Sequence, residues 1–226
     1  QSLQSLQKNK FTILRNMDTK MWSLMELKED PLFRHINQED YHSYVMPAIS
    51  DGRKKAETVN RETIYRVLRE HKAMPEMVNT GNPLLVHSET LFEGGRTRIV
   101  IYEEVLRKIF LALESKGITM DFEELVFLHT AHEFYHCLEY WNGEDISRKC
   151  PAVDYRFLGV LPRKGLVQRT REIGAHAFAK EVCRLDFHPK LLDYLLWERE
   201  DEEFSDTYFK ECMEMREMMM GDLKWQ

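Results

Sequence analysis

The segment HTAHEFYHCLEY, residues 129–140, places His132 and His136 four residues apart, with Glu133 directly after the first histidine. Residues four apart lie on one face of an α-helix, so both imidazoles can bind one metal ion. Glu133 projects to one side, where its carboxylate can take a proton from a water that the metal activates. The segment therefore predicts a zinc-dependent hydrolase site carried by a helix.

A zinc hydrolase needs a third protein ligand, and the sequence narrows where it lies. In the metzincin pattern a glycine and a third histidine follow, but Glu139 and Asn142 occupy those positions here. The other common solution is a carboxylate from a later helix. The segment TREIGAHAFAKEVC supplies Glu172, which shares a helical face with the small residues Ala175 and Ala179. We therefore predict Glu172 as the third ligand, on a helix that packs closely against the first.

Other polar side chains near these two segments are candidates for supporting roles. His176, one turn further along the second helix, either acts as a catalytic group that stabilises the oxyanion or is an ordinary buried histidine. His129 and Glu139 flank the first segment and are candidates to support the ligands, with a core histidine and a solvated glutamate as the alternatives. Tyr155 and Arg156 are candidates for substrate contact.

The two segments AHEFYHCLE and REIGAHAFAKEV together resemble the ImmA/IrrE family of zinc metallopeptidases, in which an HExxH helix precedes an ExxAxxFA helix. The resemblance spans roughly residues 45–196. It implies regulatory proteolysis of a specific partner such as a transcriptional repressor. The positions that match the family pattern are His132, Glu133, His136, Glu172, Ala175, Phe178 and Ala179. The resemblance implies that His132, His136 and Glu172 would bind zinc and that Glu133 would be the general base.

Two alternatives to a peptidase remain open on the sequence. Many family members carry glycine before the second metal-binding histidine, whereas this chain has Tyr135. A bulky side chain there, together with long terminal extensions, predicts a partly covered cleft. A non-catalytic protein that binds zinc for structure or sensing would fit such a cleft. The segment RKKAETVNRETIYRVLRE is a weaker candidate for a DNA-binding helix-turn-helix, because it lacks the usual turn glycine and the chain is acidic.

Local signals place the elements that must position these groups. Asp121 and Glu124 have the spacing of a capping box, which predicts that the HExxH helix begins there and runs to about Trp141. Gly117 predicts the end of a preceding helix over 103–116. A further helix is expected from about 168 to 184, followed by one or two more.

Strand signals precede the HExxH helix. The segments LLVHSETLF and RTRIVIY are rich in β-branched and aromatic residues and flank Glu93-Gly94-Gly95, a pattern typical of a hairpin. The resemblance implies a small antiparallel sheet beside the active-site helix, and we predict about three strands. TRIVIY would be its last strand, whose edge could bind an extended substrate.

The remaining segments are less informative. Apolar residues recur at helical spacing over 39–72, interrupted near Ser50-Asp51-Gly52, which fits two helices or one broken helix. The polar, Pro/Gly-punctuated stretch 142–165 predicts a long loop. Residues 1–10 are polar and are expected to form a loose start.

These features predict a mostly helical, zincin-like α+β fold with three parts. Residues 1–40 form an N-terminal tail or helical extension, 41–200 the metallopeptidase domain, and 201–226 an acidic, Met-rich C-terminal helix. A chain of 226 residues is long enough for one domain with a sizeable core.

Composition limits the partners and the compartment. The net charge of −6 gives no general attraction to nucleic acid, so direct nucleic-acid binding is not expected. No segment has the length of a membrane span or the pattern of a signal peptide, so we expect a cytoplasmic protein. The expected peptidase activity implies a protein or peptide as its partner. Four dispersed cysteines without a CxxC pair predict free thiols.

Overall fold

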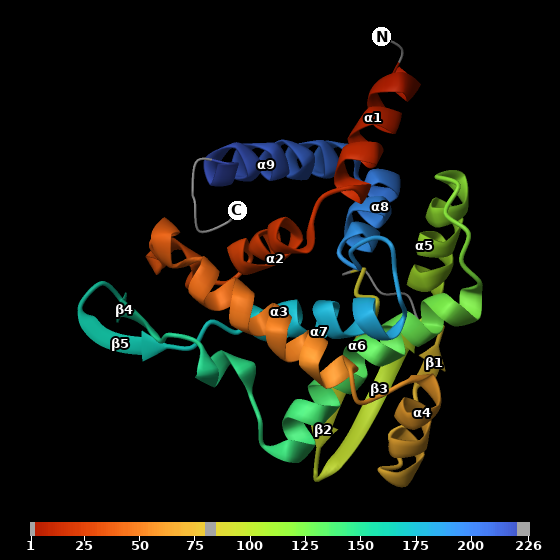
Figure 1. The fold of residues 1–226 in the computed structure, drawn as a ribbon, viewed down its shortest axis with the longest axis horizontal. Coiled ribbons are helices and arrows are strands. Elements are labelled where there is room, and N and C mark those ends of the chain that lie inside the picture. The colour runs from red at the N-terminus through yellow and green to blue at the C-terminus, as the bar shows by residue number, and fades with distance from the viewer. Residues whose placement is uncertain (1–2, 80–84, 221–226) are drawn as a thin grey trace.

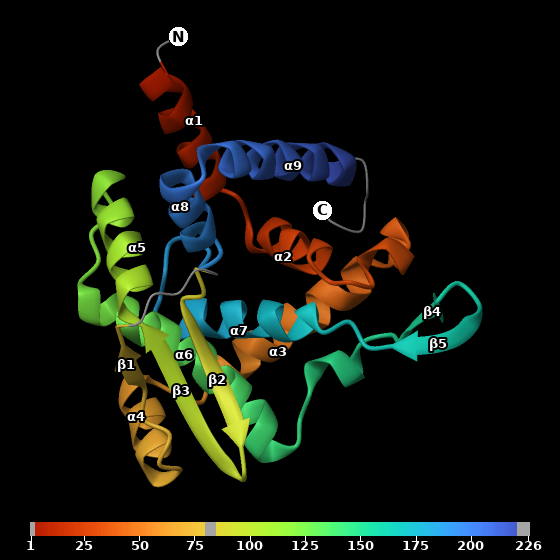
Figure 2. The same cartoon turned by 180° about the vertical axis from the view of Figure 1, so that it is seen from behind.

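The computed structural model describes residues 3–79 and 85–220, in which most helices pack together and a small sheet lies at one side, next to the HExxH helix (Figures 1 and 2). Small parts of the predicted N-terminal extension, first hairpin strand and C-terminal helix lie outside these residues. The helices are α1 (Leu3–Arg15), α2 (Thr19–Lys28), α3 (His42–Ala56), α4 (Arg61–Glu70), α5 (Glu103–Ser115), α6 (Phe122–Asn142), α7 (Arg169–Val182), α8 (Leu191–Glu200) and α9 (Glu202–Met220). The strands are β1 (Glu76–Val78), β2 (Ser88–Glu93), β3 (Arg96–Tyr102), β4 (Val153–Phe157) and β5 (Leu161–Gly165). The architecture is α+β, as predicted.

Helix α6 carries the HExxH segment and begins and ends where the sequence indicates. The Asp121 side chain accepts a hydrogen bond from the third backbone N–H of the helix, and the Glu124 carboxylate accepts one from the Asp121 N–H at 2.8 Å. This is the predicted capping box, which satisfies donors that the first turn leaves free. At the other end, Gly143 adopts a left-handed conformation with φ 63°. The predicted metal ligands His132 and His136 therefore sit in the middle of a well-capped helix.

The sheet against α6 is mixed, not antiparallel throughout. Its strand order is β1-β3-β2, with β2 antiparallel and β1 parallel to β3. The predicted hairpin is confirmed, because Gly94 and Gly95 supply the positive φ values of its turn, 56° and 77°. The prediction that TRIVIY is a substrate-binding edge strand is wrong, since β3 lies between β1 and β2. The edge nearest α6 is β2 (Figure 2).

Two other segments differ from the sequence-based expectation. Residues 39–72 form two helices, but the break falls at 57–60 and α3 passes unbroken through Ser50-Asp51-Gly52. The stretch 142–165 contains a short 3₁₀ helix and the β4–β5 hairpin, so it is not a long loop. Leu158 and Gly159 turn that hairpin with φ values of 52° and 76°. Figure 1 shows it extending away from the helices.

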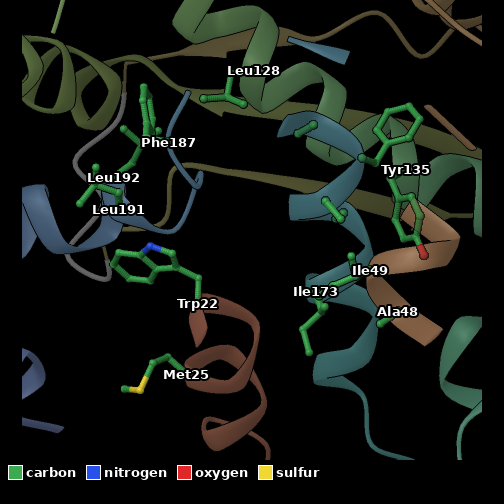
Figure 3. Packing of buried hydrophobic residues seen from close by; sticks show 14 of the residues in the cluster. Trp22, Met25, Ala48, Ile49, Leu128, Tyr135, Ile173, Phe187, Leu191 and Leu192 are labelled. Carbon is green, nitrogen blue, oxygen red and sulfur yellow. The ribbon is translucent and has the colours of Figure 1, made fainter. Parts of the chain in front are cut away.

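The N-terminal segment is part of the core. Residues 3–15 form α1, so the first ten residues are not a loose tail over the part that the structure describes. Helix α2 packs on α3, α7 and α9 and is buried almost completely. Trp22 and Met25 of α2 face the same interior as Ile173 of α7 and Leu192 of α8 (Figure 3). Helix α2 is therefore placed to contribute to any site near α7.

Helices α3 and α7 cross at very short distance. A Cβ atom added to Gly52 would lie 2.2 Å from the carbonyl oxygen of Gly174 and 2.9 Å from the backbone nitrogen of Phe178. Glycine at position 52 thus allows the two backbones to touch, although it weakens the helix itself. Ala175 and Ala179 on α7 are fully buried, in agreement with the predicted stripe of small residues.

We expect Gly52→Ala to destabilise the protein, because backbone atoms cannot move aside as a flexible side chain would. Overpacking of this kind typically costs about 1–3 kcal/mol, with a lower thermal midpoint. Differential scanning calorimetry measures it, with Ser50→Ala, an exposed position of the same helix, as the control. An unchanged midpoint would mean that α3 and α7 do not approach this closely.

Two further sequence-based expectations concern membranes and cysteines. Over the residues that the structure describes, no helix has the length and apolar character needed to cross a membrane. Cys137, Cys150, Cys183 and Cys212 are all free, as predicted. Burial raises the pKa of the Cys137 thiol to about 12, so this thiol stays protonated.

Candidate metal centre

The three predicted ligands converge in the structure. His132 and His136 of α6 and Glu172 of α7 each offer one donor atom, and these atoms all lie within 4.8 Å of one another. His132 Nε2 lies 3.1 Å from Glu172 Oε2, and His136 Nε2 lies 3.4 Å from Glu172 Oε1. Donors about 2.0–2.2 Å from a tetrahedral ion are separated by distances of about this size. Two imidazoles and one carboxylate are also a donor set that zinc uses, so the residues fit a zinc ion.

The charges of these groups favour a cation between them. Burial alone would lower the pKa of His136, but the charge of Glu172 together with hydrogen bonds to Glu139 and Glu172 raises that pKa to about 10. The metal-free ring is therefore protonated at neutral pH, and zinc would have to displace this proton. Burial alone would raise the pKa of Glu172, yet the charge of His136 and a hydrogen bond from His132 hold it well below its usual range. Glu172 is therefore ionised at neutral pH, which is the form that binds metal.

A buried carboxylate supports the second histidine from behind. Glu139 Oε2 lies 3.6 Å from His136 Nδ1 and accepts a hydrogen bond from Arg171 Nε at 2.8 Å. Its other oxygen accepts from the backbone N–H of Ile146 at 3.1 Å. Metal-binding histidines commonly have a carboxylate at the second nitrogen, which fixes the ring orientation. Glu139 is thus buried behind His136 and can orient its ring, as one of the two expectations for this residue predicted. It is not a solvated surface residue.

Glu133 lies beside the three ligands but is not one of them. Its side chain is directed to the edge strand β2, where Ser88 Oγ donates to Oε1 at 2.7 Å and Thr90 Oγ1 donates to Oε2 at 2.8 Å. Ser88 and Thr90 are two apart and therefore face the same side of the strand. The two hydroxyls fix both oxygens of the carboxylate. The sequence analysis did not identify them, although their period-two spacing on a strand next to the HExxH helix was a usable signal.

Tyr135 does not narrow the cleft, contrary to the prediction. Its side chain is fully buried, and its hydroxyl donates to Asp51 Oδ2 of α3 at 2.8 Å. A Cβ atom added to Gly174 would lie 2.2 Å from the same hydroxyl oxygen, so Tyr135 fills the space that this glycine leaves. Figure 3 shows the tyrosine directed at α3. It ties α6 to α3 and α7 and leaves the metal centre uncovered.

His176 lies beside the centre and contacts a residue of the N-terminal segment. Its ring centroid is 4.8 Å from that of His132. Its Nε2 lies 3.5 Å from Glu26 Oε2 of α2, while its Nδ1 is buried with no hydrogen-bond partner among the described residues. Glu26 also accepts from Arg169 at 2.8 Å and contacts Lys190 Nζ at 2.6 Å. Neither Glu26 nor Lys190 was predicted, because Glu26 lies far from both predicted metal-binding segments and Lys190 follows the second one without a recognisable motif.

Two cavities open on the centre. One, of about 360 Å³, is lined by His132, Glu133, Glu172 and His176 and extends to α2 and α8. The other, of about 370 Å³, lies over β2 and includes Arg171. The three candidate ligands are therefore accessible from two sides, which leaves room for water or substrate beside them.

The other predicted site residues lie outside the ligand set. His129 is buried, and burial together with the neighbouring His87 lowers its pKa to about 3, so the ring is neutral. Its Nδ1 donates a hydrogen bond to the Leu125 carbonyl at 2.9 Å. His129 is thus a buried histidine with a backbone partner, the core histidine that was one of the two expectations. Tyr155 and Arg156 lie on β4, where Tyr155 packs near His35 at 6.1 Å between ring centroids. Neither of them lines either of the two cavities described above.

Comparison of the chain with protein-family models, with curated proteins and with solved structures gives no match. What this centre does must therefore be inferred from its own geometry.

Proposed function

We propose that the chain is a zinc metallo-endopeptidase with a His₂Glu site of the gluzincin type and a zincin-like fold, akin to the ImmA/IrrE family. The observation that carries this proposal is the convergence of His132, His136 and Glu172 with Glu133 beside them and outside the ligand set. When bound, zinc would polarise the substrate carbonyl and lower the pKa of a water toward about 7.

In this proposal Glu133 moves the proton. Its carboxylate is 4% exposed and held by two hydroxyls, so it has one defined orientation. Each oxygen accepts one hydroxyl hydrogen and keeps a further lone pair with which to accept a proton from the attacking water. The same oxygen would then return that proton to the leaving amine as the peptide bond breaks.

His176 is the proposed group that stabilises negative charge on the substrate carbonyl oxygen. It lines the cavity next to His132, and its Nε2 makes only the long 3.5 Å contact with Glu26. A substrate oxygen at hydrogen-bond distance could take over this hydrogen as charge develops. Before substrate binds, the contact with Glu26 keeps the ring oriented from the side of α2.

A non-catalytic zinc protein of the same fold is the second candidate, and one observation favours it. Both oxygens of Glu133 are already engaged by Ser88 and Thr90, as in a carboxylate with a purely structural role. Tyr135, which suggested a covered cleft, no longer supports this candidate because it points away from the centre.

Proteolysis of a defined set of peptides decides between the two. We expect the zinc-loaded protein to leave casein largely intact and to cleave few sequences, consistent with regulatory cleavage of one partner such as a transcriptional repressor. New amino termini in a peptide library are detected by mass spectrometry, with and without a chelator. Absence of any chelator-sensitive cleavage in the library and in candidate repressors would favour the non-catalytic protein.

Loss of the hydroxyls on β2 should reduce hydrolysis without removing zinc. The double variant Ser88→Ala, Thr90→Val leaves the Glu133 carboxylate free to rotate, and we expect a fall in kcat/KM of about tenfold, equivalent to one or two hydrogen bonds. Ser88→Ala with Thr90→Ser restores one hydroxyl and should recover part of the rate. Equal rates for these two double variants would show that the hydroxyl at position 90 does not position the base.

A further inference from the structure

The cavity of about 360 Å³ extends beyond the metal centre to a wall that the proposed mechanism does not use. This wall is formed by the C-terminal end of α2, the chain just before β2, the first residue of α7, and α8 with the residue before it. Its polar members, with Trp197 beside them, are Glu29, His87, Arg169, Lys190 and Asp193.

A buried lysine holds the carboxylates of this wall in place. Lys190 is 1% exposed, and its Nζ contacts Glu26 at 2.6 Å, Glu29 at 2.7 Å and Asp193 at 3.4 Å. Burial alone would lower the pKa of Lys190, but the charge of Glu26 and its neighbours raises it well above the usual range. The side chains of Glu29 and Asp193 remain 32% and 25% exposed. Lys190 thus holds the carboxylates of Glu29 and Asp193 in place from the buried side of the cavity wall.

Hydrogen-bond direction can be assigned along a chain of two histidines behind this wall. The Leu125 carbonyl can only accept, so His129 donates to it from Nδ1, and the unprotonated Nε2 of His129 must accept. His87 Nδ1, 3.2 Å from that nitrogen, is therefore the donor. In a neutral imidazole the other nitrogen carries no hydrogen, and burial lowers the pKa of His87, which favours the neutral ring.

This assignment leaves two acceptors facing each other. His87 Nε2 lies 3.4 Å from Asp193 Oδ1, and both residues line the cavity. Two lone pairs at this distance repel unless a hydrogen-bond donor lies beside them. Lys190 contacts the other oxygen, Oδ2. Among the residues that the structure describes, no hydrogen-bond donor satisfies these two atoms, so a molecule in the cavity can supply one.

The charge of the wall specifies the kind of donor. Glu29 and Asp193 in the wall, and Glu26 beside it, contribute three carboxylates. They face two cations, Lys190 and Arg169, which leaves one negative charge in excess. Trp197 adds an aromatic surface beside them, and aromatic faces favour cationic groups. A positively charged nitrogen group would satisfy both the charge and the acceptors.

We propose that the wall of Glu29, His87 and Asp193 is a specificity subsite for a lysine or arginine side chain of the substrate, next to the scissile bond. This inference rests on the proposed peptidase function. The side chain's ammonium or guanidinium group would donate to Asp193 Oδ1 and His87 Nε2. Charge-assisted hydrogen bonds of this type are about twice as strong as neutral ones.

Binding of two hydroxamate probes to the zinc-loaded protein tests the subsite without requiring turnover. Nα-acetyl-lysine hydroxamate and Nα-acetyl-norleucine hydroxamate differ only in the terminal ammonium group. Isothermal titration calorimetry should give an affinity about tenfold or more higher for the lysine probe. Asp193→Asn should remove most of this preference and leave the norleucine affinity unchanged, which also shows that the variant is folded. The exposed Asp154→Asn on β4 is the matched control and should keep the full preference.

Each other outcome contradicts a distinct step. Equal affinities of the two probes for the unaltered protein would overturn the cationic subsite and leave the metal centre intact. A lysine preference that persists in both Asp193→Asn and Glu29→Gln would place the ammonium group elsewhere. Tighter binding of norleucine hydroxamate with a free amino group than of its acetylated form would assign the wall to a peptide amino terminus. If neither probe binds, the zinc centre itself is wrong, and the subsite fails with it.

Discussion

Glu172→Ala should release most of the bound zinc, with affinity falling by at least about 100-fold. Loss of groups that merely support a ligand typically costs 10–100-fold, and Glu172 is a direct ligand in our assignment. The purified protein should contain about one zinc per chain, measured by plasma emission spectroscopy. Competition with a chromophoric chelator then gives the affinity. Alanine at His132 or His136 should have a comparable effect.

A control on the same helix separates metal loss from damage to α7. Glu181 is 45% exposed and pairs only with Arg53 among the described residues, so Glu181→Ala should keep its zinc. Far-ultraviolet circular dichroism checks that both variants retain the helical fold. Full zinc content in a folded Glu172→Ala protein would falsify the choice of third ligand.

Glu133→Gln should retain zinc and lose peptide hydrolysis by about 10²–10⁴-fold. Glutamine has nearly the same shape and can still accept from one of the two hydroxyls on β2, but it cannot take a proton from water. The expected change is therefore in kcat, with little effect on zinc affinity. Cleavage is followed at the library peptide that the unaltered protein cuts best, with Glu123→Gln in the first turn of α6 as the control.

The two measurements together separate the two candidate functions. Loss of cleavage with zinc retained identifies Glu133 as the proton carrier. Chelator-sensitive cleavage that survives in Glu133→Gln would require a different base. If the unaltered protein binds zinc and Glu133→Gln only lowers its thermal midpoint, the carboxylate is structural and the non-catalytic protein is the better description.

The parts of the site that follow from short-range pattern were predictable. HExxH needs only helical spacing, the capping box fixes the start of α6, and the small side chains beside Glu172 point to a closely packed helix. The cluster of candidate metal ligands combines these local signals, and a single pairing of two helices brings it together.

Groups set by long-range packing were not predictable. Glu26 and Lys190 meet across more than half the chain, and nothing near either residue marks it as part of a site. The three-residue strand β1 is too short to show alternation, so the parallel pairing that makes β3 central had no sequence signal. The β4–β5 hairpin was hidden because its Pro and Gly residues are equally typical of a loop.

The prediction for Tyr135 failed for a geometric reason. Residue 135 lies only about 60° from His132 around α6, on the side away from Glu133. The structure shows that its hydroxyl reaches Asp51 of α3 there. A comparison of residue size at that position says nothing about the cleft unless the direction of the side chain is known.

The contact of Glu26 with Lys190 also has a consequence for how the protein is made. Glu26 is made before the HExxH segment, whereas His176, Lys190 and Asp193 are made after it, and domains generally fold as units during synthesis. A nascent chain that has already exposed its HExxH segment still lacks Glu172 and one wall of the cavity. Translation order thus keeps a growing chain incapable of the proposed cleavage until α7 and α8 have been made.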